Sequence, residues 1–254
     1  MNISRLEIDS KAFGCNVLEF HGSDFTDFSR FEAEYLERFK PFYVFSKVPS
    51  KDLAKIHALE SEGFNFVEFQ YKLSFKLRKI LDTTSFNYSY TLVENEEELE
   101  AVSGIAASIF EGIDRYSSDP LLSNLGLSDV AGERYRQYLG KSFHSPDEYV
   151  YKFVDKETDE IVGFGSHRHL SSDKVLLYIG GVKKRYANTG LGAINDFFGY
   201  NALMKKGLRK GITHVSGSNT SIMNLEVVGL GHRVIDSYAV MRKLYLENLA
   251  SGRG

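Results

Sequence analysis

The sequence feature that most constrains the fold is the segment 175–207, in which an apolar run is followed by a basic, glycine-containing turn and a long amphipathic pattern. The run Val175–Val182 has the character of a strand, and Gly190 and Gly192 stand in the first turn of the helix expected after it. The first amides of a helix have no intrahelical partner, and glycine has no Cβ to keep an anion away. The segment therefore predicts a strand–turn–helix unit whose turn holds a phosphate or pyrophosphate.

Positive charge in the same turn agrees with an anionic ligand, because Lys183, Lys184 and Arg185 precede the glycines. Two other nucleotide-binding motifs do not match. A P-loop ends in Gly-Lys-Ser/Thr, and a dinucleotide-binding turn needs a third glycine and an early strand. A Gly-x-Gly turn that binds nothing remains the alternative.

The N-terminal part of the chain has a helix–glycine–strand pattern. Ser50 is the expected N-cap of a helix that ends at Gly63, and polar and apolar residues alternate from 68 to 77 as in a half-buried strand. The polar stretch 82–89 follows, and we place a domain boundary there. The prediction is a small α/β domain over 1–85 and a larger domain over 86–254.

The larger domain is expected to hold a mixed, mostly antiparallel sheet flanked by helices, an α/β (α+β) fold. Short turns connect three strand-like runs, which predicts an antiparallel meander, and the later strand–helix–strand order predicts one parallel pair. The expected helices are 94–110, 129–143, 192–206 and 220–228, and the expected strands are 148–155, 161–170, 175–182, 212–216 and 238–244.

A weak internal repeat links the two parts. The sequence LESEGFNFVEFQYKL, from Leu59, is similar to LEVVGLGHRVIDSYAVM, from Leu225, with Leu-Glu and Gly in register before an alternating strand. Either chance or a duplicated half-domain accounts for it.

Composition narrows the possible partners and compartments. Lys and Arg number 31 against 34 for Asp and Glu, a net charge of −3, which gives no basic footprint for nucleic acid or an anionic membrane. Cys15 is the only cysteine, so an intramolecular disulfide and a thiolate zinc site are excluded. Neither a secretory signal nor an apolar run of about 18 residues is present, and we expect a cytoplasmic protein.

The order of elements and the turn together resemble the GCN5-related N-acetyltransferase (GNAT) family. The family's turn reads Gln/Arg-x-x-Gly-x-Gly/Ala, and the segment here is Ala187-Asn188-Thr189-Gly190-Leu191-Gly192, with Ala193 after it. The glycines match, and Ala187 departs from the pattern.

Both ends of the chain are similar to one branch, the dTDP-fucosamine N-acetyltransferases, which acetylate the amine of a nucleotide-linked deoxysugar. The opening SKAFGCNVLEF and the segment around Arg115 and Tyr116 carry this likeness. It implies that 1–85 is a degenerate half-GNAT unit, and that Arg115 and Tyr116 bind the acceptor's diphosphate and base or sugar. A solvated turn is the alternative for these two residues.

The resemblance implies acetyl-CoA as co-substrate, no metal, and direct transfer to a small primary amine, most plausibly an amino sugar of a nucleotide-sugar. Strand 175–182 would bind the pantetheine arm through its backbone, and the splayed strand 212–216 would open the slot. Asn219 would contact the coenzyme or simply cap the next helix. The implied coenzyme-binding residues are Gly181, Val182, Lys183, Asn188, Thr189, Gly190, Leu191, Gly192, Ala193 and Asn219.

The family's thiolate-protonating tyrosine is missing, because the seventh residue after Asn219 is Glu226. Glu226 is the candidate acid in its place, with a solvated residue on a helix face as the alternative. His167 and His169 alternate onto one face of a strand and are candidate bases, and Tyr178 is a further candidate for the cleft.

Two other functions stay open. The same fold could acetylate an amino acid, a polyamine or a peptide amine, and an acidic cleft would favour the polyamine. The missing tyrosine and Ala187 also allow a non-catalytic acyl-CoA-binding module. Neither nucleic acid nor membrane is expected as a partner, and a homodimer is left open.

Overall fold

A computed structural model describes residues 2–22, 28–111, 116, 119–127 and 130–249. Its ten strands are β1 (Ile3–Arg5), β2 (Asn16–Phe20), β3 (Pro41–Pro49), β4 (Asn65–Lys76), β5 (Tyr88–Leu92), β6 (Glu148–Asp155), β7 (Glu160–His169), β8 (Lys174–Val182), β9 (Lys210–Ser216) and β10 (Arg233–Leu244). They form one sheet in the order β1-β2-β3-β10-β4-β9-β8-β7-β6-β5.

The α-helices are α1 (Glu7–Phe13), α2 (Phe28–Phe39), α3 (Leu53–Ser61), α4 (Glu96–Phe110), α6 (Pro120–Asn124), α7 (Val130–Phe143), α8 (Leu191–Lys205) and α9 (Thr220–Asn224). A π-helical turn, Leu225–Gly229, continues α9, and 3₁₀ turns lie at Lys184–Tyr186 and Leu246–Asn248. In the described part of the chain, every helix is too short or too polar to cross a membrane.

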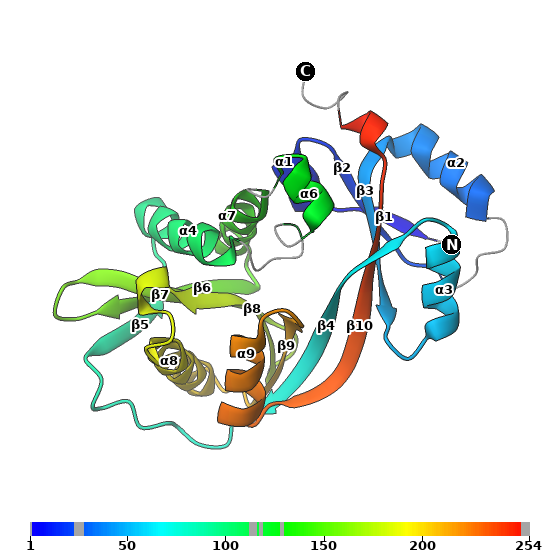
Figure 1. The fold of residues 1–254 in the computed structure, drawn as a ribbon. Coiled ribbons are helices and arrows are strands. Elements are labelled where there is room, and N and C mark those ends of the chain that lie inside the picture. Colours follow the sequence, from blue (N-terminus) through cyan, green and yellow to red (C-terminus); the bar gives the residue numbers. More distant parts are fainter. Residues whose placement is uncertain (1, 23–27, 112–115, 117–118, 128–129, 250–254) are drawn as a thin grey trace.

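Helices cover both faces of the sheet (Figure 1). Helices α4 and α7 pack on one face of β6 and β7, and α8 packs on the other. Helix α7 also joins α1 and α6 in a second core, where Val130 and Leu122 meet Phe13 of α1 and Val240 of β10. On the α8 side of the sheet, α2 and α3 cover β2 and β3.

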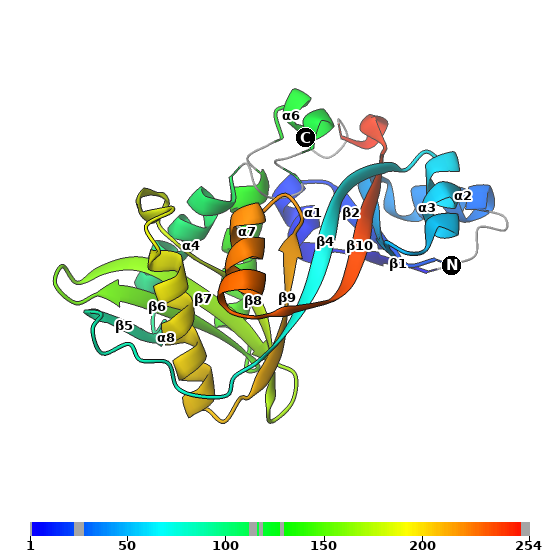
Figure 2. The ribbon, with the colours of Figure 1, turned by 60° about the horizontal axis from the view of Figure 1, so that its bottom comes forward.

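The two long central strands are exchanged between the two parts of the chain. Strand β4 follows the N-terminal elements, yet it pairs with β9, and β10 returns from the C-terminal end to pair with β3. The two strands also pair with each other, antiparallel, from Arg233↔Ser74 to Arg242↔Asn65. Figure 2 shows them running side by side through the middle of the molecule. Each part of the chain therefore completes its sheet with a strand of the other.

The parallel pair predicted for the larger domain is confirmed, and the N-terminal part of the chain contains a second one. Beside the expected pair β8–β9, strands β2 and β3 are parallel and are joined through α2. The N-terminal order β2-α2-β3-α3-β4 thus repeats the C-terminal order β8-α8-β9-α9-β10. The similar segment from Leu59 covers the end of α3 and most of β4. The one from Leu225 covers the π-helical turn and most of β10. The degenerate half-unit over 1–85 and its boundary at residue 85 remain predictions.

The elements of 90–249 lie close to where the sequence placed them. The meander β6–β7–β8 is antiparallel, and its strands end within a residue or so of the expected positions. Helix α3 has a different cap from the expected one, because Asp52, not Ser50, accepts the amide of Lys55 at 3.2 Å. Strand β10 begins at Arg233, five residues before the expected Tyr238, because it needs this length to span β4.

Candidate functional site

The parallel strands β8 and β9 separate soon after they begin. They are paired only at Lys174↔Lys210, Val175↔Gly211 and Leu176↔Ile212. Gly211 permits the close approach there, since a Cβ on it would lie 2.3 Å from the Phe75 ring and 2.8 Å from Val175. The irregularity at Tyr178, where β8 has one more residue than β7, falls just beyond the paired part. The opening between these strands that the family resemblance implies is therefore present.

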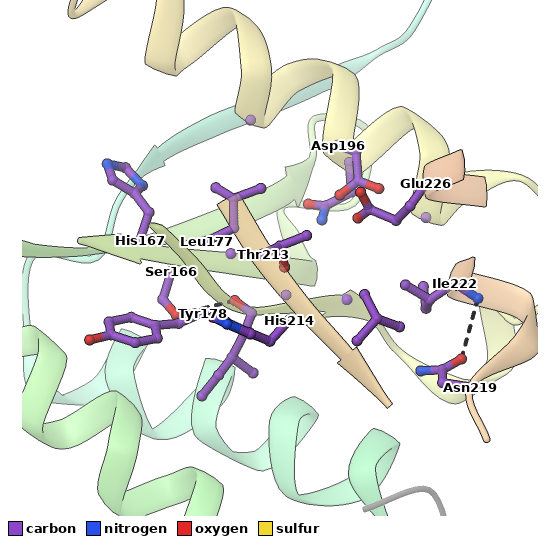
Figure 3. A pocket seen from close by; sticks show the side chains of 18 of the residues that line it. Ser166, His167, Leu177, Tyr178, Asp196, Thr213, His214, Asn219, Ile222 and Glu226 are labelled. Atoms are coloured by element: carbon purple, nitrogen blue, oxygen red, sulfur yellow. Dashed lines mark hydrogen bonds between the residues drawn. The ribbon is translucent and has the colours of Figure 1, made fainter. Parts of the chain in front are cut away.

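A cavity of about 290 Å³ occupies this slot. Its walls come from both faces of the sheet: α8 and the π-turn on one side, α4 and α7 on the other. In Figure 3, Asp196 and Glu226 point toward each other on the α8 side with His167, whereas Ser166 and Tyr178 lie toward α4 and α7. The slot thus connects two chemically different chambers.

The N-terminus of α8 lies at the cavity wall and has free amides. Gly190 is the N-cap at φ +86°, a conformation that favours glycine, and Gly192 lines the cavity with open space at its Cβ position. The Leu191 amide donates to Thr189 Oγ1 at 3.3 Å. Within the described residues, the amides of Gly192 and Ala193 have no hydrogen-bond acceptor. The turn therefore fits an anion such as a pyrophosphate.

The basic run beside this turn is already engaged by carboxylates. Lys183 Nζ donates to Glu160 at 2.6 Å, Arg185 also contacts Glu160, and Lys184 Nζ donates to Glu111 at 2.8 Å. None of the three lines the cavity. An anion in the turn would thus be held by backbone amides and the α8 dipole rather than by these side chains.

The remaining predicted coenzyme residues divide into two groups. Gly181 lines the cavity with Asn219, whose Oδ1 accepts the Ile222 amide at 3.3 Å and so caps α9. Both interpretations of Asn219 are thus compatible with its position. The others support the turn rather than line the cavity: Asn188 has φ +62°, Leu191 is the buried first residue of α8, and Val182 packs in the same cluster.

The α8-side chamber gathers acidic and hydroxyl groups. Burial, with the charge of Glu226, raises the pKa of Asp196 well above its usual range. Glu226 is 8% exposed and contacts the ring of the buried His232. The His232 Nε2 atom lies 3.0 Å from the hydroxyl oxygen of Tyr200, which also lines the cavity. Glu226 therefore lies in the cavity as expected of a candidate acid, but within a network.

His167 lines the same chamber, and it is a weak base. It is 3% exposed and stacks on Tyr149 and Tyr151. Burial, helped by His169 and Lys206, lowers the pKa of His167 to about 3. An imidazole with this pKa is a poor acceptor for a proton from an ammonium group. Because His169 does not line the cavity, the pair gives little support to the predicted base role.

The chamber toward α4 and α7 is polar and aromatic. The rings of Phe110 and Tyr135 stack at 4.0 Å, and Gln70 and Glu68 reach the cavity from the exchanged strand β4. Arg134 is also at its wall, with its Nε donating to the buried Asp9 at 2.8 Å. Tyr178 lines this side too, with Arg168 4.8 Å from its ring centre.

Only one of the two predicted acceptor-binding residues is described, and it lies away from the cavity. Arg115 lies outside the described residues. Tyr116 is fully buried against Phe13 and Tyr43, and its hydroxyl donates to Asp9 at 2.6 Å. In this position the ring of Tyr116 packs in the core between α1 and α7 and is not available to stack on a base.

Sequence reasoning missed several residues of the cavity wall, and His232 behind it. Asp196 and Tyr200 are four positions apart on α8, so their common face was readable from the helical period. His232 and Gln70 gave no such signal, because their positions depend on the π-turn and on the strand exchange. The described residues contain no group of three His, Cys, Asp or Glu arranged for a metal ion.

Comparison with known proteins shows the fold. The sequence matches no established family profile and no curated protein. Among solved structures, a GCN5-related N-acetyltransferase from Sphaerobacter thermophilus has a TM-score of 0.63 at 11% identity, over 95% of this chain and 76% of that one. A tandem GNAT protein from the clavulanic acid biosynthesis pathway has a TM-score of 0.58 at 12% identity, over 90% and 75% of the two chains.

A third structure, the GCN5-related glucosamine N-acetyltransferase region of a fungal multi-domain β-N-acetylglucosaminidase, has a TM-score of 0.59 at 11% identity. It is covered over 31% of its length by 95% of this chain. The mixed, mostly antiparallel sheet flanked by helices is therefore the fold of GNAT N-acetyltransferases, as the element order predicted.

Proposed function

We propose that the protein is an acetyl-CoA-dependent N-acetyltransferase that transfers the acetyl group directly to a small primary amine. The observation that carries this proposal is the slot between β8 and β9, which opens beside the free amides of α8 and leads into a cavity between both faces of the sheet. A thioester donor on one side and an amine on the other would meet in this slot. Holding two reactants together contributes about 7 to 11 kcal/mol to catalysis.

The donor's parts correspond to parts of the cavity wall. The amides of Gly192 and Ala193 would hold the pyrophosphate, the β8 backbone at Gly180 and Gly181 the pantetheine arm, and Asn219 its polar groups. When bound, acetyl-CoA supplies an activated acyl group. The chain supplies backbone donors, and Gly181 brings no side chain that could block the arm.

For the acceptor we propose an amino sugar. The stacked rings of Phe110 and Tyr135 offer a flat apolar surface, and Glu68, Gln70 and Arg134 offer hydrogen-bonding groups around it. A polyhydroxylated ring needs this combination of apolar contact and directional polar groups. The glucosamine N-acetyltransferase region among the similar structures adds support from likeness.

The nucleotide of a nucleotide-sugar has less support than the sugar. Arg134 is at the cavity wall but is engaged by Asp9, and Arg136 pairs with Glu100 away from the cavity. The carboxylates Glu68 and Glu226 at the cavity wall also make a cationic amine such as a polyamine a second candidate. A nucleotide-linked sugar and a polyamine therefore belong in the same test.

The test is release of free thiol from acetyl-CoA with a panel of amines: glucosamine, a dTDP-linked 4-amino-4,6-dideoxy sugar, a polyamine, an amino acid and a peptide. We expect the highest kcat/KM with an amino sugar. Preference for the polyamine would overturn the acceptor proposal. Binding of CoA in calorimetry without thiol release from any amine would instead indicate a non-catalytic module.

A matched pair of variants tests the donor site. Gly192→Glu places a carboxylate at the α8 N-terminus, where we expect it to repel the pyrophosphate and weaken CoA binding more than tenfold, about 1.4 kcal/mol. Gly140→Glu adds the same charge to α7, also with open space at its Cβ and away from the cavity. Equal CoA affinity in the two variants would contradict the proposed donor site.

A further inference from the structure

The face of α8 above the α8-side chamber has no apolar side chain in the first half of the helix. Gly192, Asn195, Asp196 and Gly199 share this face at helical spacing, and all four line the cavity. A helix that covers a sheet normally buries apolar residues there. The apolar residues of α8 instead pack in two separate clusters. The helix therefore leaves a polar space between itself and the sheet.

Glycines on the sheet extend this space sideways from the slot. Gly165 of β7 and Gly180 of β8 are paired neighbours, and both line the cavity. A Cβ on Gly165 would lie 2.3 Å from the hydroxyl oxygen of Tyr90, and one on Gly199 would lie 3.3 Å from it. Because these positions carry no side chains, the chamber reaches from the slot to the Tyr90 hydroxyl group.

Tyr90 places a neutral hydroxyl group at the wall of the chamber. It belongs to β5, at the edge of the sheet, and its ring stacks on Tyr151 with centres 4.9 Å apart. Burial raises the pKa of Tyr90 above its ordinary value, so the hydroxyl group keeps its proton. Within the described residues this hydroxyl group makes no hydrogen bond, although Tyr90 lines the cavity. It is therefore able to donate to a ligand.

A second polar group in the chamber also lacks a partner. Asn195 is 3% exposed, and its Nδ2 donates to the carbonyl oxygen of Phe164 at 3.2 Å. Its Oδ1 is buried and, in the part of the chain that the structure describes, accepts no hydrogen bond. Buried polar atoms are usually paired, so an unpaired one indicates a missing ligand group or water molecule.

The carboxyl groups of the chamber decide which charge a ligand can carry. Asp196 and Glu226 point toward each other at its wall (Figure 3). Burial raises the pKa of Asp196 well above its usual range, which shows that negative charge is unfavourable in this place. An anionic group is therefore disfavoured, and a neutral group that both donates and accepts hydrogen bonds, such as a hydroxyl, fits best.

The chamber lies where the acyl end of the donor would arrive. In the proposed site the pyrophosphate is held at the N-terminus of α8, and the pantetheine arm follows β8 along Gly181 and Gly180. The slot closes beyond them, because β8 and β9 are paired at Leu176↔Ile212. Gly180 brings no side chain between the slot and the chamber. The acyl group can therefore turn into the chamber while the amine approaches from the side of α4 and α7.

We infer that the α8-side chamber binds a hydroxyl substituent of the acyl group, and that the protein also transfers short hydroxyacyl groups from coenzyme A. This inference rests on the proposed donor site. The substituent would accept a hydrogen bond from Tyr90 and donate one to an oxygen of Asn195 or Asp196. In the transfer, the C–N bond forms as the C–S bond breaks, and sulfur leaves with the electron pair. The proton released by the amine reaches the thiolate through solvent, so the products are free CoA thiol and an N-hydroxyacyl amide.

The first experiment compares butyryl-CoA with 3-hydroxybutyryl-CoA, which differ by one oxygen atom. Calorimetry on the unsubstituted protein should give one enantiomer of 3-hydroxybutyryl-CoA a Kd about tenfold lower than that of butyryl-CoA. Succinyl-CoA, whose acyl group ends in a carboxylate, should bind more weakly than either. Equal Kd values for butyryl-CoA and both enantiomers, or tightest binding of succinyl-CoA, would overturn the inference and leave the chamber to water.

Tyr90→Phe and Tyr88→Phe form a matched pair of variants. Both tyrosines come from β5 and contact the ring of Phe153, but Tyr88 does not line the cavity. In Tyr90→Phe we expect the Kd values of butyryl-CoA and 3-hydroxybutyryl-CoA to lie within about twofold of each other. The tenfold preference should remain in Tyr88→Phe. A preference of the same size in both variants would refute the role of the Tyr90 hydroxyl group.

A second matched pair changes the size of the chamber. Gly199→Ala places a methyl group 3.3 Å from the Tyr90 hydroxyl oxygen, whereas Gly140→Ala adds one to α7 in open space away from the cavity. We expect Gly199→Ala to weaken 3-hydroxybutyryl-CoA binding about fivefold or more, and Gly140→Ala to leave it unchanged. Equal affinities in the two variants would show that the acyl group does not enter the chamber.

Thiol release separates this inference from the proposed function. With glucosamine as acceptor, kcat/KM should be about tenfold higher for 3-hydroxybutyryl-CoA than for butyryl-CoA. If 3-hydroxybutyryl-CoA binds more tightly but no amine releases thiol, the transferase proposal fails and the hydroxyacyl site stands. If acetyl-CoA supports transfer but the two four-carbon donors bind equally, only the hydroxyacyl site fails. If none of these thioesters binds, the donor site and the hydroxyacyl site are both wrong.

Discussion

Replacing His167 by phenylalanine should make the protein more resistant to acid. His167 is 3% exposed and stacks on Tyr149, Tyr151 and His169 with ring centres 5.3 to 5.5 Å apart. A phenyl ring keeps the stacking but has no site to protonate. His167→Phe therefore removes one buried titrating group with little change in packing.

The size of the effect follows from the pKa. In the folded chain the pKa of His167 is lowered to about 3, below its ordinary value of 6.5, so between these values the unfolded chain holds a proton that the folded chain does not. The free energy of unfolding must then fall as the pH drops from 6.5 toward 3. At 1.36 kcal/mol per pH unit, His167 lowers the free energy of unfolding by about 2.7 kcal/mol at pH 4.5 relative to neutral pH.

Urea unfolding at several pH values from 7.5 to 4.5 measures this cost. Other groups contribute to acid sensitivity, including His214, whose pKa burial and two lysines lower to about 4. The loss of unfolding free energy between pH 7.5 and pH 4.5 is therefore measured in both proteins. The contribution of His167 is the loss in the unsubstituted protein minus the loss in His167→Phe. A difference below about 0.5 kcal/mol at pH 4.5 would mean that His167 titrates normally, and His167 would again be a candidate base.

Two further substitutions test the packing around the site. Asp9→Asn should lower the free energy of unfolding by about 3 kcal/mol in urea, because it removes the buried carboxylate to which Arg134 donates. A loss under about 1 kcal/mol would contradict a buried pair. Gly163→Ala places a Cβ 2.8 Å from the carbonyl oxygen of Gly181 and 2.9 Å from Val182. We therefore expect the free energy of unfolding to fall by about 1 to 3 kcal/mol, with a lower Tm. An unchanged Tm would show that β7 and β8 are not so closely paired.

The sequence predicted the C-terminal part of the fold well because its signals are local. The meander strands alternate, short polar turns separate them, and the glycines before α8 identify its first turn. The exchange of β4 and β10 had no local signal, since an alternating strand does not specify its neighbour. The first parallel pair was missed for a related reason: β3 is buried on both faces, so Phe42, Val44 and Phe45 give no period.

The parts of the site that are formed by backbone were easier to predict than the parts that are formed by contacts between side chains. Gly190 and Gly192 followed from sequence pattern, and the slot was implied by the family resemblance. The basic run was expected to assist an anion but pairs with Glu160 and Glu111, because those carboxylates come from the ends of β7 and α4. His232 reached the chamber through the π-turn, which shifts the helix end in a way that spacing from Asn219 does not show.

The exchanged strands also have a consequence for synthesis. Strand β3 is almost wholly buried, and one of its edges is covered only by β10, whose Tyr238 pairs with Pro49 across 189 positions of sequence. At a ribosomal rate of about 5 to 20 residues per second, that edge waits about 10 to 40 s for its partner. An apolar strand with an open edge invites pairing with another chain. Aggregation of nascent protein should therefore respond to translation speed between β3 and β10 and to chaperones that bind extended apolar segments.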